Sequence, residues 1–600
     1  MFYYFILALI CAIVSFVIIF DFDDYANAPE AGFLAAVVFV VVWLVCWLLL
    51  PNIGWRFTSW IWILLIVSVI SSIIAESFGG KTGGNLVVTA AIVVFAVVFL
   101  FICWFSTAEA FHYKDYRDLL TVSEATDSNY HADFVPIKPD EMIKVDVPLA
   151  GKYASAVLEQ DAAIGSSCCV NRFYRIRLQE DLNVTLATGE TKILPLKGEV
   201  VYLSPLEHSS FWRWKRNRTT PGYILVSAQR QNEVYFITKV NGEYLRLKYL
   251  RSSFFDSYIK RHIRKAGYLN GVTNFSVVLD PSGRPFVTAT LYCKTIGFSG
   301  EKVTGMLTVD VQTGEIKEYT LDNLPSWIDR VYPENFVRNY INYWGKYPQY
   351  SAEELEELIM KGETPKKLNW RNSFLSRTKV KMMTPGMTAL YNNGERYIYT
   401  GIQSAGADDG TSGIMMFNST TGEATLYKLE GGANEESTRA KFEKNYKIDA
   451  AEVSASEVII YPVRGENLYF ATLKGASGDF LGYGISSVKY RELAAVGKSV
   501  DEALLNYYVA KRNANLDTQA IESNTTESKV YKVYLMTMED GIYYFRFEGI
   551  SGKEYMALPK LSKELKWTQI GDRVQVSYSQ SMAEDESIML ENFENLSFAF

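Results

Sequence analysis

Four long runs of apolar residues lead the chain, and alternating apolar and polar positions follow them. The runs cover residues 2–20, 33–50, 57–75 and 86–105. Each is about as long as the 17 to 25 residues that a helix needs to cross the hydrocarbon core of a membrane. Because the connections are short, neighbouring helices must be antiparallel. The pattern predicts a four-helix transmembrane domain over residues 1–110.

One alternative to membrane spans stays open, a bundle of long buried helices in a soluble protein. A cleaved signal peptide is not indicated, because a signal begins with a basic segment and only Met1 precedes the first run. Membrane spans are favoured by tryptophans near the ends of the runs, where an interfacial aromatic belt is expected: Trp55, Trp60, Trp62 and Trp104.

The basic residues near the runs predict the orientation of the helices. Arg56, Lys114 and Arg117 would lie on one side of the membrane and Lys81 on the other. Since basic residues near spans concentrate on the cytoplasmic side, both termini and the soluble region are expected in the cytoplasm.

Beyond residue 110 the chain reads as short strands separated by turns. Apolar or aromatic alternation flanks a glycine-containing turn in "LDPSGRPFVTATLY", "LYNNGERYIYTGI", "PVRGENLYFATL" and "TMEDGIYYFRF", which predicts antiparallel hairpins. Helices are expected at "SAEELEELIMKG", "SVDEALLNYYVAKR" and "FFDSYIKRHIRKAG". The predicted fold class is α+β, with the transmembrane bundle followed by tandem antiparallel β-rich modules and a small C-terminal barrel.

A similar sequence motif occurs twice, as "GMLTVDVQTGEIKEYTL" from Gly305 and "GIMMFNSTTGEATLYKL" from Gly413. The pattern predicts a strand, a turn whose glycine adopts a positive φ, and a second strand. Asp or Asn at the start of the turn can accept bonds from the backbone that follows. A turn explains every matched position without invoking chemistry. The turn residues are Asp310, Thr313, Gly314, Asn418, Thr421 and Gly422.

The repeated turn and its strands resemble the PepSY-like modules of bacterial membrane-associated proteins. The wider layout, with "LPSWIDRVYPENF" and "SPLEHSSFWRWKRNRTTPGYILVS", looks like membrane-anchored proteins of bacteria and their phages. This resemblance implies a bacterial inner or plasma membrane location, and it lends no catalytic residues. A third meander near residues 465–490 lacks the turn and is either a degenerate module or a continuation of the second.

The expected organisation has seven parts. They are a transmembrane domain (1–110), a membrane-proximal α+β domain (111–219), a first β-meander module (220–345), a helical connector (346–375), a second β-meander module (376–512), a polar linker (513–529) and a small β-barrel-like domain (530–600). In the last part, "IGDRVQVSY" resembles a strand of an OB-like barrel.

The composition and the absence of known motifs argue against several functions. The chain has 4 histidines in 600 residues, and none has a nucleophile at motif spacing. No phosphate-binding loop, zinc-binding spacing or other catalytic motif occurs, so no catalytic residue, cofactor or metal site is expected. The formal net charge of −7 argues against nucleic acid as a partner.

Two basic stretches are candidates for contact with anionic lipid or a partner protein. A surface loop with stacked Arg and Trp remains an alternative for "FWRWKRNR", and complementation of a helix dipole remains one for "YIKRHIRK". The candidate residues are Trp212, Arg213, Trp214, Lys215, Arg216, Arg218, Lys260, Arg261, Arg264 and Lys265.

Three functions are compatible with these features. The leading hypothesis is a non-enzymatic integral membrane protein that acts as a scaffold through its large soluble region, with the bilayer and a protein partner or a second copy as its contacts. A component of a transport or channel complex is the second, although the runs hold almost no ionisable residues. A membrane-bound enzyme is the third.

Overall fold

The structure is a computed structural model of the 600-residue chain. It describes residues 2–20, 28–77, 82–125, 142–163, 174–175, 183–186, 200–346, 380–382, 388–392, 395–404, 411–432, 435–446, 452–456, 458–463, 466–490, 492–514, 526–539, 542–559, 561–579, 587–590 and 592–597. The helix expected at 351–362 lies outside these residues.

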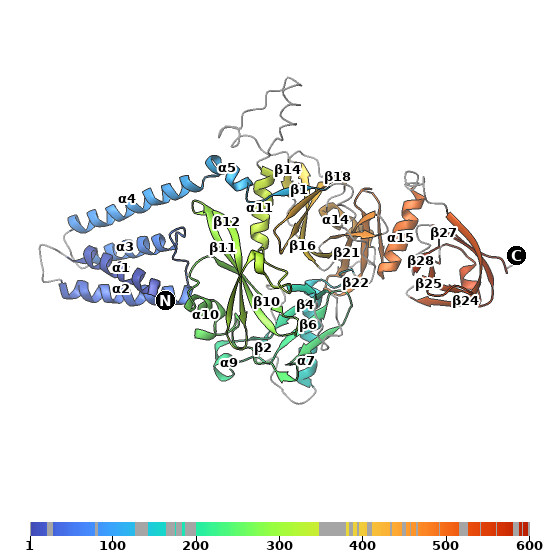
Figure 1. Cartoon of the computed structure of the whole chain (residues 1–600), viewed down its shortest axis with the longest axis horizontal. Helices are drawn as coiled ribbons and strands as arrows, with labels where there is room; N and C mark the ends of the chain where they lie inside the picture. Colours follow the sequence, from blue (N-terminus) through green and yellow to red (C-terminus); the bar gives the residue numbers. More distant parts are fainter. Residues whose placement is uncertain are drawn as a thin grey trace, which may run out of the picture.

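Four apolar helices extend from one side of the molecule (Figure 1). Two of them, α2 and the Thr89–Thr107 part of α4, are long and apolar enough to cross a membrane, and α1 and α3 are shorter apolar helices. Signal sequences and core helices of soluble proteins share these properties. Only 17% and 11% of the two apolar windows are buried, which is unlike a core helix. The helices are α1 (Phe2–Ile19), α2 (Ala28–Leu49), α3 (Ser59–Ser77) and α4 (Thr82–Thr107).

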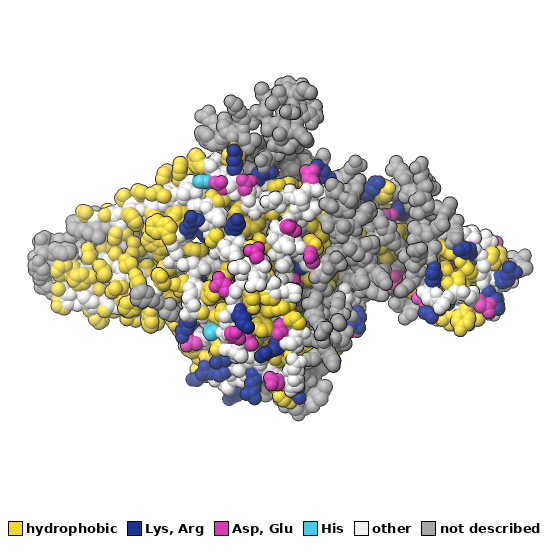
Figure 2. Space-filling model, in the orientation of Figure 1, with side chains coloured by type: hydrophobic (Ala, Val, Ile, Leu, Met, Phe, Trp, Pro, Cys, Tyr) yellow, Lys and Arg dark blue, Asp and Glu magenta, His cyan; other side chains and the backbone are white. Residues whose placement is uncertain are grey.

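The start of α1 and the end of α4 both lie at the end of the helical bundle that is nearest the β-rich part (Figure 1). The hydroxyl of Tyr4, near the start of α1, donates to the carbonyl of Pro51 just after α2 (2.9 Å). A short helix, α5 (Glu109–Arg117), continues from α4, and Tyr116 on it donates to the Thr107 carbonyl (2.7 Å). The surface of the helices that Figure 2 shows is almost entirely hydrophobic.

The first β-sheet follows helix α7 (Val147–Ala163) and has the order β3-β4-β6-β7. Its strands are β3 (Asn183–Leu186), β4 (Val200–Pro205), β6 (Tyr223–Ser227) and β7 (Val234–Ile237). Because β4 and β6 pair along their length, the boundary expected between residues 219 and 220 runs through this sheet. Short elements surround it: β2 (Tyr174–Arg175), β5 (Glu207–His208), α9 (Phe211–Arg216), β8 (Lys239–Val240) and β9 (Glu243–Tyr244).

The second sheet is a simple antiparallel meander that holds the first copy of the repeated turn. It is preceded by η3 (Phe255–Ser257) and α10 (Ile259–Lys265), and η4 (Leu321–Asn323) and α11 (Glu334–Lys346) follow it. Its strands are β10 (Val272–Leu279), β11 (Pro285–Ile296), β12 (Ser299–Asp310) and β13 (Ile316–Thr320).

The third sheet holds the second copy of the turn and has the order β1-β18-β17-β16-β14, with β15 paired to β16. Strand β1 comes from the segment after α5 and pairs in parallel with β18, which ties the helical part to this sheet. The strands are β1 (Val122–Glu124), β14 (Val380–Met382), β15 (Thr388–Asn392), β16 (Glu395–Ser404), β17 (Thr411–Asn418) and β18 (Ala424–Gly432).

The meander near residues 465–490 belongs to a separate fourth sheet of order β19-β21-β22-β23, with β20 paired to β21. Helix α15 begins as the sequence predicts, since the Ser499 hydroxyl accepts the N–H of Glu502 (3.1 Å). The elements are α14 (Glu435–Asn445), β19 (Val453–Ala455), β20 (Ile459–Val463), β21 (Glu466–Gly475), β22 (Phe480–Ser487), β23 (Ala494–Gly497) and α15 (Val500–Asn513).

A curled C-terminal half-barrel of order β28-β26-β25-β24-β27-β29 ends the chain, on the opposite side of the molecule from α1–α4 (Figure 1). The mixed α+β class is therefore confirmed, with N-terminal helices followed by antiparallel sheets. The elements are β24 (Thr526–Glu539), β25 (Ile542–Phe547), β26 (Glu554–Ala557), η6 (Leu565–Trp567), β27 (Arg573–Ser579), β28 (Ser587–Met589) and β29 (Asn592–Asn595).

The sheets share continuous cores. One cluster joins the first sheet to β10–β12, and another joins α11 to β16–β18. Polar contacts also join the segment between η4 and α11 to the third sheet. The hydroxyl of Tyr391 on β15 donates to the carboxylate of Asp329 in that segment (2.5 Å). The N–H groups of Val331 and Tyr332 both donate to the Ser419 carbonyl (3.0 and 3.1 Å). These contacts fix the position of one repeat against the other.

Candidate membrane-contact surface

Helix α10 packs on the C-terminal end of α2 through two arginines. Arg261 donates to the backbone carbonyl of Trp47 (3.0 Å) and stacks its guanidinium 3.8 Å from the centre of the Trp47 ring. Arg264 donates to the side-chain oxygen of Asn52 (2.5 Å). The last four carbonyls of a helix lack partners within the helix and carry partial negative charge, so a cation there is stabilising.

The cations of α10 are therefore mostly engaged within the protein. Arg261 and Arg264 are only 6% and 8% exposed. Lys265 pairs with Asp256 (2.6 Å), and Lys260 lies over the ring of Phe275 (5.3 Å). Burial, with help from neighbouring arginines, lowers the pKa of Lys260. The sequence leaves lipid contact and complementation of the helix's own dipole open for this stretch. The structure instead places Arg261 and Arg264 against the end of α2, and these contacts leave little of the stretch for lipid.

A second contact joins the soluble part to the helices at the β11–β12 hairpin. Phe298 at the hairpin tip packs edge-on against Phe99 of α4 (ring centres 5.7 Å apart). It belongs to a cluster with Trp60 of α3. Arg56, between α2 and α3, donates to the backbone carbonyl of Lys294 in the same hairpin. The first module is thus held to α2, α3 and α4 at separate points.

Helix α9 divides the aromatic residues of "FWRWKRNR" between interior and surface. Trp214 is 1% exposed and contacts Phe211, Phe254 and Phe255 with ring centres 5.5 to 5.9 Å apart. Arg218 lies 4.0 Å from the centre of the Trp214 ring. Trp214 and Arg218 therefore have a structural role, as in a loop with stacked Arg and Trp.

The remaining residues of α9 face outward. Trp212 is 71% exposed, and Lys215 lies over its ring (5.5 Å). Lys215 and Arg216 are exposed, whereas Arg213 is half-buried. Lys and Arg side chains gather over α9 in Figure 2. No acidic residue occurs between Ser209 and Arg218.

The exposed face of α9 continues to the apolar end of α2 through η3. Phe255 contacts Phe211 on one side (6.1 Å) and Trp47 on the other (6.2 Å). Phe255 is nevertheless 49% exposed, and Leu48 and Leu49 at the end of α2 are 65% and 72% exposed. We call the surface formed by Trp212, Lys215, Arg216, Phe254 and Phe255 the α9 rim.

The repeated turns have a common geometry. Gly314 and Gly422 both have φ of +81°. The side-chain oxygen of Asp310 accepts the N–H groups of Gln312 and Thr313 (2.8 and 3.1 Å), and that of Asn418 accepts those of Thr420 and Thr421 (2.9 and 3.0 Å). The first turn also supports α10, because the Gly314 carbonyl lies 2.7 Å from Nε2 of His262.

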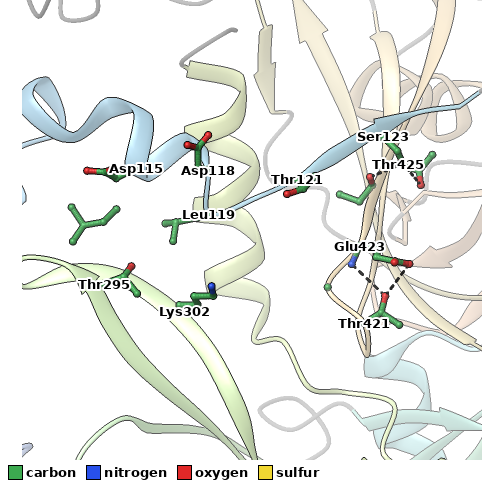
Figure 3. A pocket seen from close by; sticks show the side chains of 13 residues that line it. Asp115, Asp118, Leu119, Thr121, Ser123, Thr295, Lys302, Thr421, Glu423 and Thr425 are labelled. Atoms are coloured by element: carbon green, nitrogen blue, oxygen red, sulfur yellow. Dashed lines mark hydrogen bonds between the residues drawn. The ribbon is translucent and has the colours of Figure 1, made fainter. Parts of the chain in front are cut away.

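The second turn lines a polar groove of about 980 Å³ between the helical part and the third sheet (Figure 3). Asp115 of α5 and Asp118 just after it lie on one side of the groove, Lys302 of β12 lies on the opposite side, and Thr421 and Glu423 of the turn line its other end. The Thr421 hydroxyl bonds within the turn, to the N–H and carboxylate of Glu423 (3.3 and 3.4 Å). The side chains that line the groove include hydroxyls and carboxylates. The hydrogen bonds of Thr421 and Glu423 there are those that hold the turn.

Neither the metal-ligand chemistry of the described side chains nor comparison with known proteins indicates a function. Within the described residues, no group of three or more His, Cys, Asp or Glu side chains could hold a metal ion. No protein-family model matches the sequence. No curated protein matches it either. The contact residues that sequence reasoning missed are Trp47, Phe254, Phe255 and Phe298, and the adjacent "FF" in the polar segment "RSSFFDS" is the signal that could have found two of them.

Proposed function

We propose that the protein is a non-enzymatic, multi-pass membrane protein that acts as a scaffold, holding its β-rich region at the cytoplasmic surface of a bacterial membrane. The observation that carries this proposal is the attachment of the first module to the helix ends through Arg261, Arg264 and Phe298. A module fixed at several points presents its surfaces in one orientation, as a scaffold requires.

Four spans are part of the proposal. The helices have 18, 22, 19 and 26 residues, and a rise of about 1.5 Å per residue brings even the shortest close to the thickness of a hydrocarbon core. Several polar groups among the described residues of these helices bond to one another or to the helix backbone. Ser71 donates to Ser15 (2.9 Å), and Ser68 donates to the Leu64 carbonyl (2.8 Å). Such pairing suits a hydrocarbon environment.

The interaction surfaces would lie on the β-rich sheets and the C-terminal half-barrel, for which an OB-like role in protein contact or assembly is proposed. Apolar and aromatic side chains are exposed on the half-barrel, among them Tyr534, Met538, Trp567 and Ile570. Exposed groups of this kind favour contact with a protein partner or a second copy.

The proposal is tested by measuring how rigidly the module is held. Spin labels replace Val87 of α4 and Lys317 of β13, both exposed, in the full chain reconstituted into lipid nanodiscs. A narrow distance distribution between the labels is expected, and the combined Arg261→Ala and Phe298→Ser changes should broaden it. A second pair at Lys239 and Lys317 reports the fold of the soluble part and should not change. A broad distribution in the unmodified chain would overturn the scaffold proposal.

A further inference from the structure

The α9 rim combines exposed aromatic rings with exposed cations beside the end of an apolar helix. Large aromatic side chains are exposed at Trp212 and Phe255, and two cations, Lys215 and Arg216, are exposed beside them. Trp side chains collect at membrane interfaces because the ring is apolar and its N–H is polar, and Phe side chains supply the apolar face of interfacial segments. Cations beside them are attracted by the negative charge of the cytoplasmic leaflet.

The α9 rim lies next to the end of the apolar helix α2. Phe255 touches Trp47 in the last turn of α2, so the rim begins where an apolar helix ends. If α2 crosses the bilayer, a surface adjoining its end lies at the level of the lipid headgroups. The continuity extends through Phe211, whose ring lies 5.4 Å from Trp212 and 6.1 Å from Phe255.

The conformation of Phe255 is held by its neighbours. Its φ of +51° is left-handed, which is rare for a bulky aromatic residue. Its ring packs against Phe211, Trp214 and Trp47, and its carbonyl accepts a hydrogen bond from Arg261 (3.0 Å). These contacts hold the ring at the junction between α9 and α2, where the side chain stays 49% exposed.

We propose that the α9 rim binds anionic phospholipid headgroups, with Trp212 and Phe255 in the interfacial layer and Lys215 and Arg216 on the phosphates. The buried part of α9, Trp214 under Arg218, is the fixed base that presents them. The inference rests on the proposed membrane anchoring and adds a lipid-dependent contact that orients the first module against the leaflet.

The test uses an environment-sensitive fluorophore at Ser210, an exposed residue beside α9, in the full chain with Cys168, Cys169 and Cys293 replaced by Ser. The protein is reconstituted into vesicles of neutral phosphatidylcholine, with or without anionic phosphatidylglycerol. Shielding of the fluorophore from the neutral quencher acrylamide is measured. Shielding is expected only with the anionic lipid, and high salt should remove it.

The variant Lys215→Glu with Arg216→Glu should abolish this shielding. Each cation near an anionic leaflet strengthens contact roughly five-fold, so removing two weakens it by about 25-fold, and reversing their charge weakens it further. The matched control is Lys563→Glu with Lys566→Glu. These two exposed lysines lie in the half-barrel, away from the helices, and Lys566 lies over the ring of the exposed Trp567 (5.1 Å).

The outcomes separate the inference from the proposed function. Release of the protein from the vesicles by alkaline carbonate would contradict the membrane anchoring itself. Retained protein with equal quenching in both lipids would overturn the lipid contact alone. Shielding that follows the protein-to-lipid ratio rather than lipid charge would also overturn it, and would identify a second copy of the chain as the occupant of the rim.

Discussion

Arg261 caps the end of a helix more than two hundred positions earlier in the sequence, with its guanidinium stacked on Trp47 (3.8 Å) and bonded to the Trp47 carbonyl (3.0 Å). A planar guanidinium can stack on a ring and donate in its plane at the same time, whereas an ammonium group cannot. Loss of the Arg261 side chain, which is 6% exposed, would leave the Trp47 carbonyl without this donor.

Replacing Arg261 by Ala should therefore loosen the attachment of the first module. The stacking and the bond together are worth on the order of 1 to 3 kcal/mol. We expect a lower melting temperature for the full chain in detergent, with Arg261→Lys in between. The control is Lys265→Ala on the same helix, whose exposed pair with Asp256 should contribute less than about 1 kcal/mol. Equal effects at the two positions would contradict the capping role.

The repeated turns predict a second stability effect. A Cβ at Gly422 would lie 2.5 Å from Cζ of Tyr332, and one at Gly314 would lie 2.6 Å from Cε2 of Tyr249, in addition to the cost of a positive φ. Replacing either glycine by Ala should cost about 1 to 3 kcal/mol, measured as a shift in thermal unfolding.

Gly242 separates the steric term from the backbone term. Its φ of +84° matches the turn glycines, but no atom lies within 4 Å of a Cβ placed there. Gly242→Ala should therefore destabilise the protein less than Gly314→Ala or Gly422→Ala. Replacing Glu315 or Glu423 by Gln should change stability little. A loss of partner binding from the Glu changes, with stability intact, would indicate a site where we describe a turn.

Features set by neighbouring residues could be predicted from the sequence. The hairpin at Asp280–Gly283 and the start of α15 at Ser499 depend on turn and cap chemistry within a few positions. The strands could also be predicted, because alternation of apolar and polar residues is a pattern of neighbouring positions. These features carry the α+β class of the fold.

Features set by distant contacts could not be predicted. The sequence places four cations on α10, but only packing decides that Arg261 and Arg264 meet α2. The pairing of β4 with β6 likewise places α9 in the connection between two strands of one sheet, which the basic residues of α9 do not indicate. The split of α9 into a buried Trp214 and an exposed Trp212 follows from the same packing.

A pH effect is expected from His208, which precedes α9 and is 2% exposed. Burial lowers the pKa of His208 from 6.5 to about 4. Between these values the unfolded chain binds a proton that the folded chain does not, so stability falls as the pH falls from about 6.5 to 4. Above 6.5 the residue is neutral in both states and contributes no slope.

The measurement is the melting temperature of the full chain at pH 7.5 and pH 5, compared with that of His208→Asn. Carboxylates also titrate in this range, so the informative quantity is the difference between the two proteins. The variant should lose less stability on acidification than the unmodified chain. A variant with an unchanged pH dependence would show that His208 is not responsible.

The orientation of the chain gives the last prediction. If the four proposed spans are correct, Arg56, Lys114 and Arg117 lie on one side of the membrane, and the half-barrel should face the cytoplasm. A cysteine at the exposed Ser551, in a chain with Cys168, Cys169 and Cys293 replaced by Ser, should resist a membrane-impermeant maleimide in intact cells and react after lysis. A cysteine at Asn27, between α1 and α2, should react in intact cells. Labelling at Ser551 in intact cells would reverse the topology, and labelling of both positions only after lysis would argue that α1 and α2 do not form a membrane hairpin.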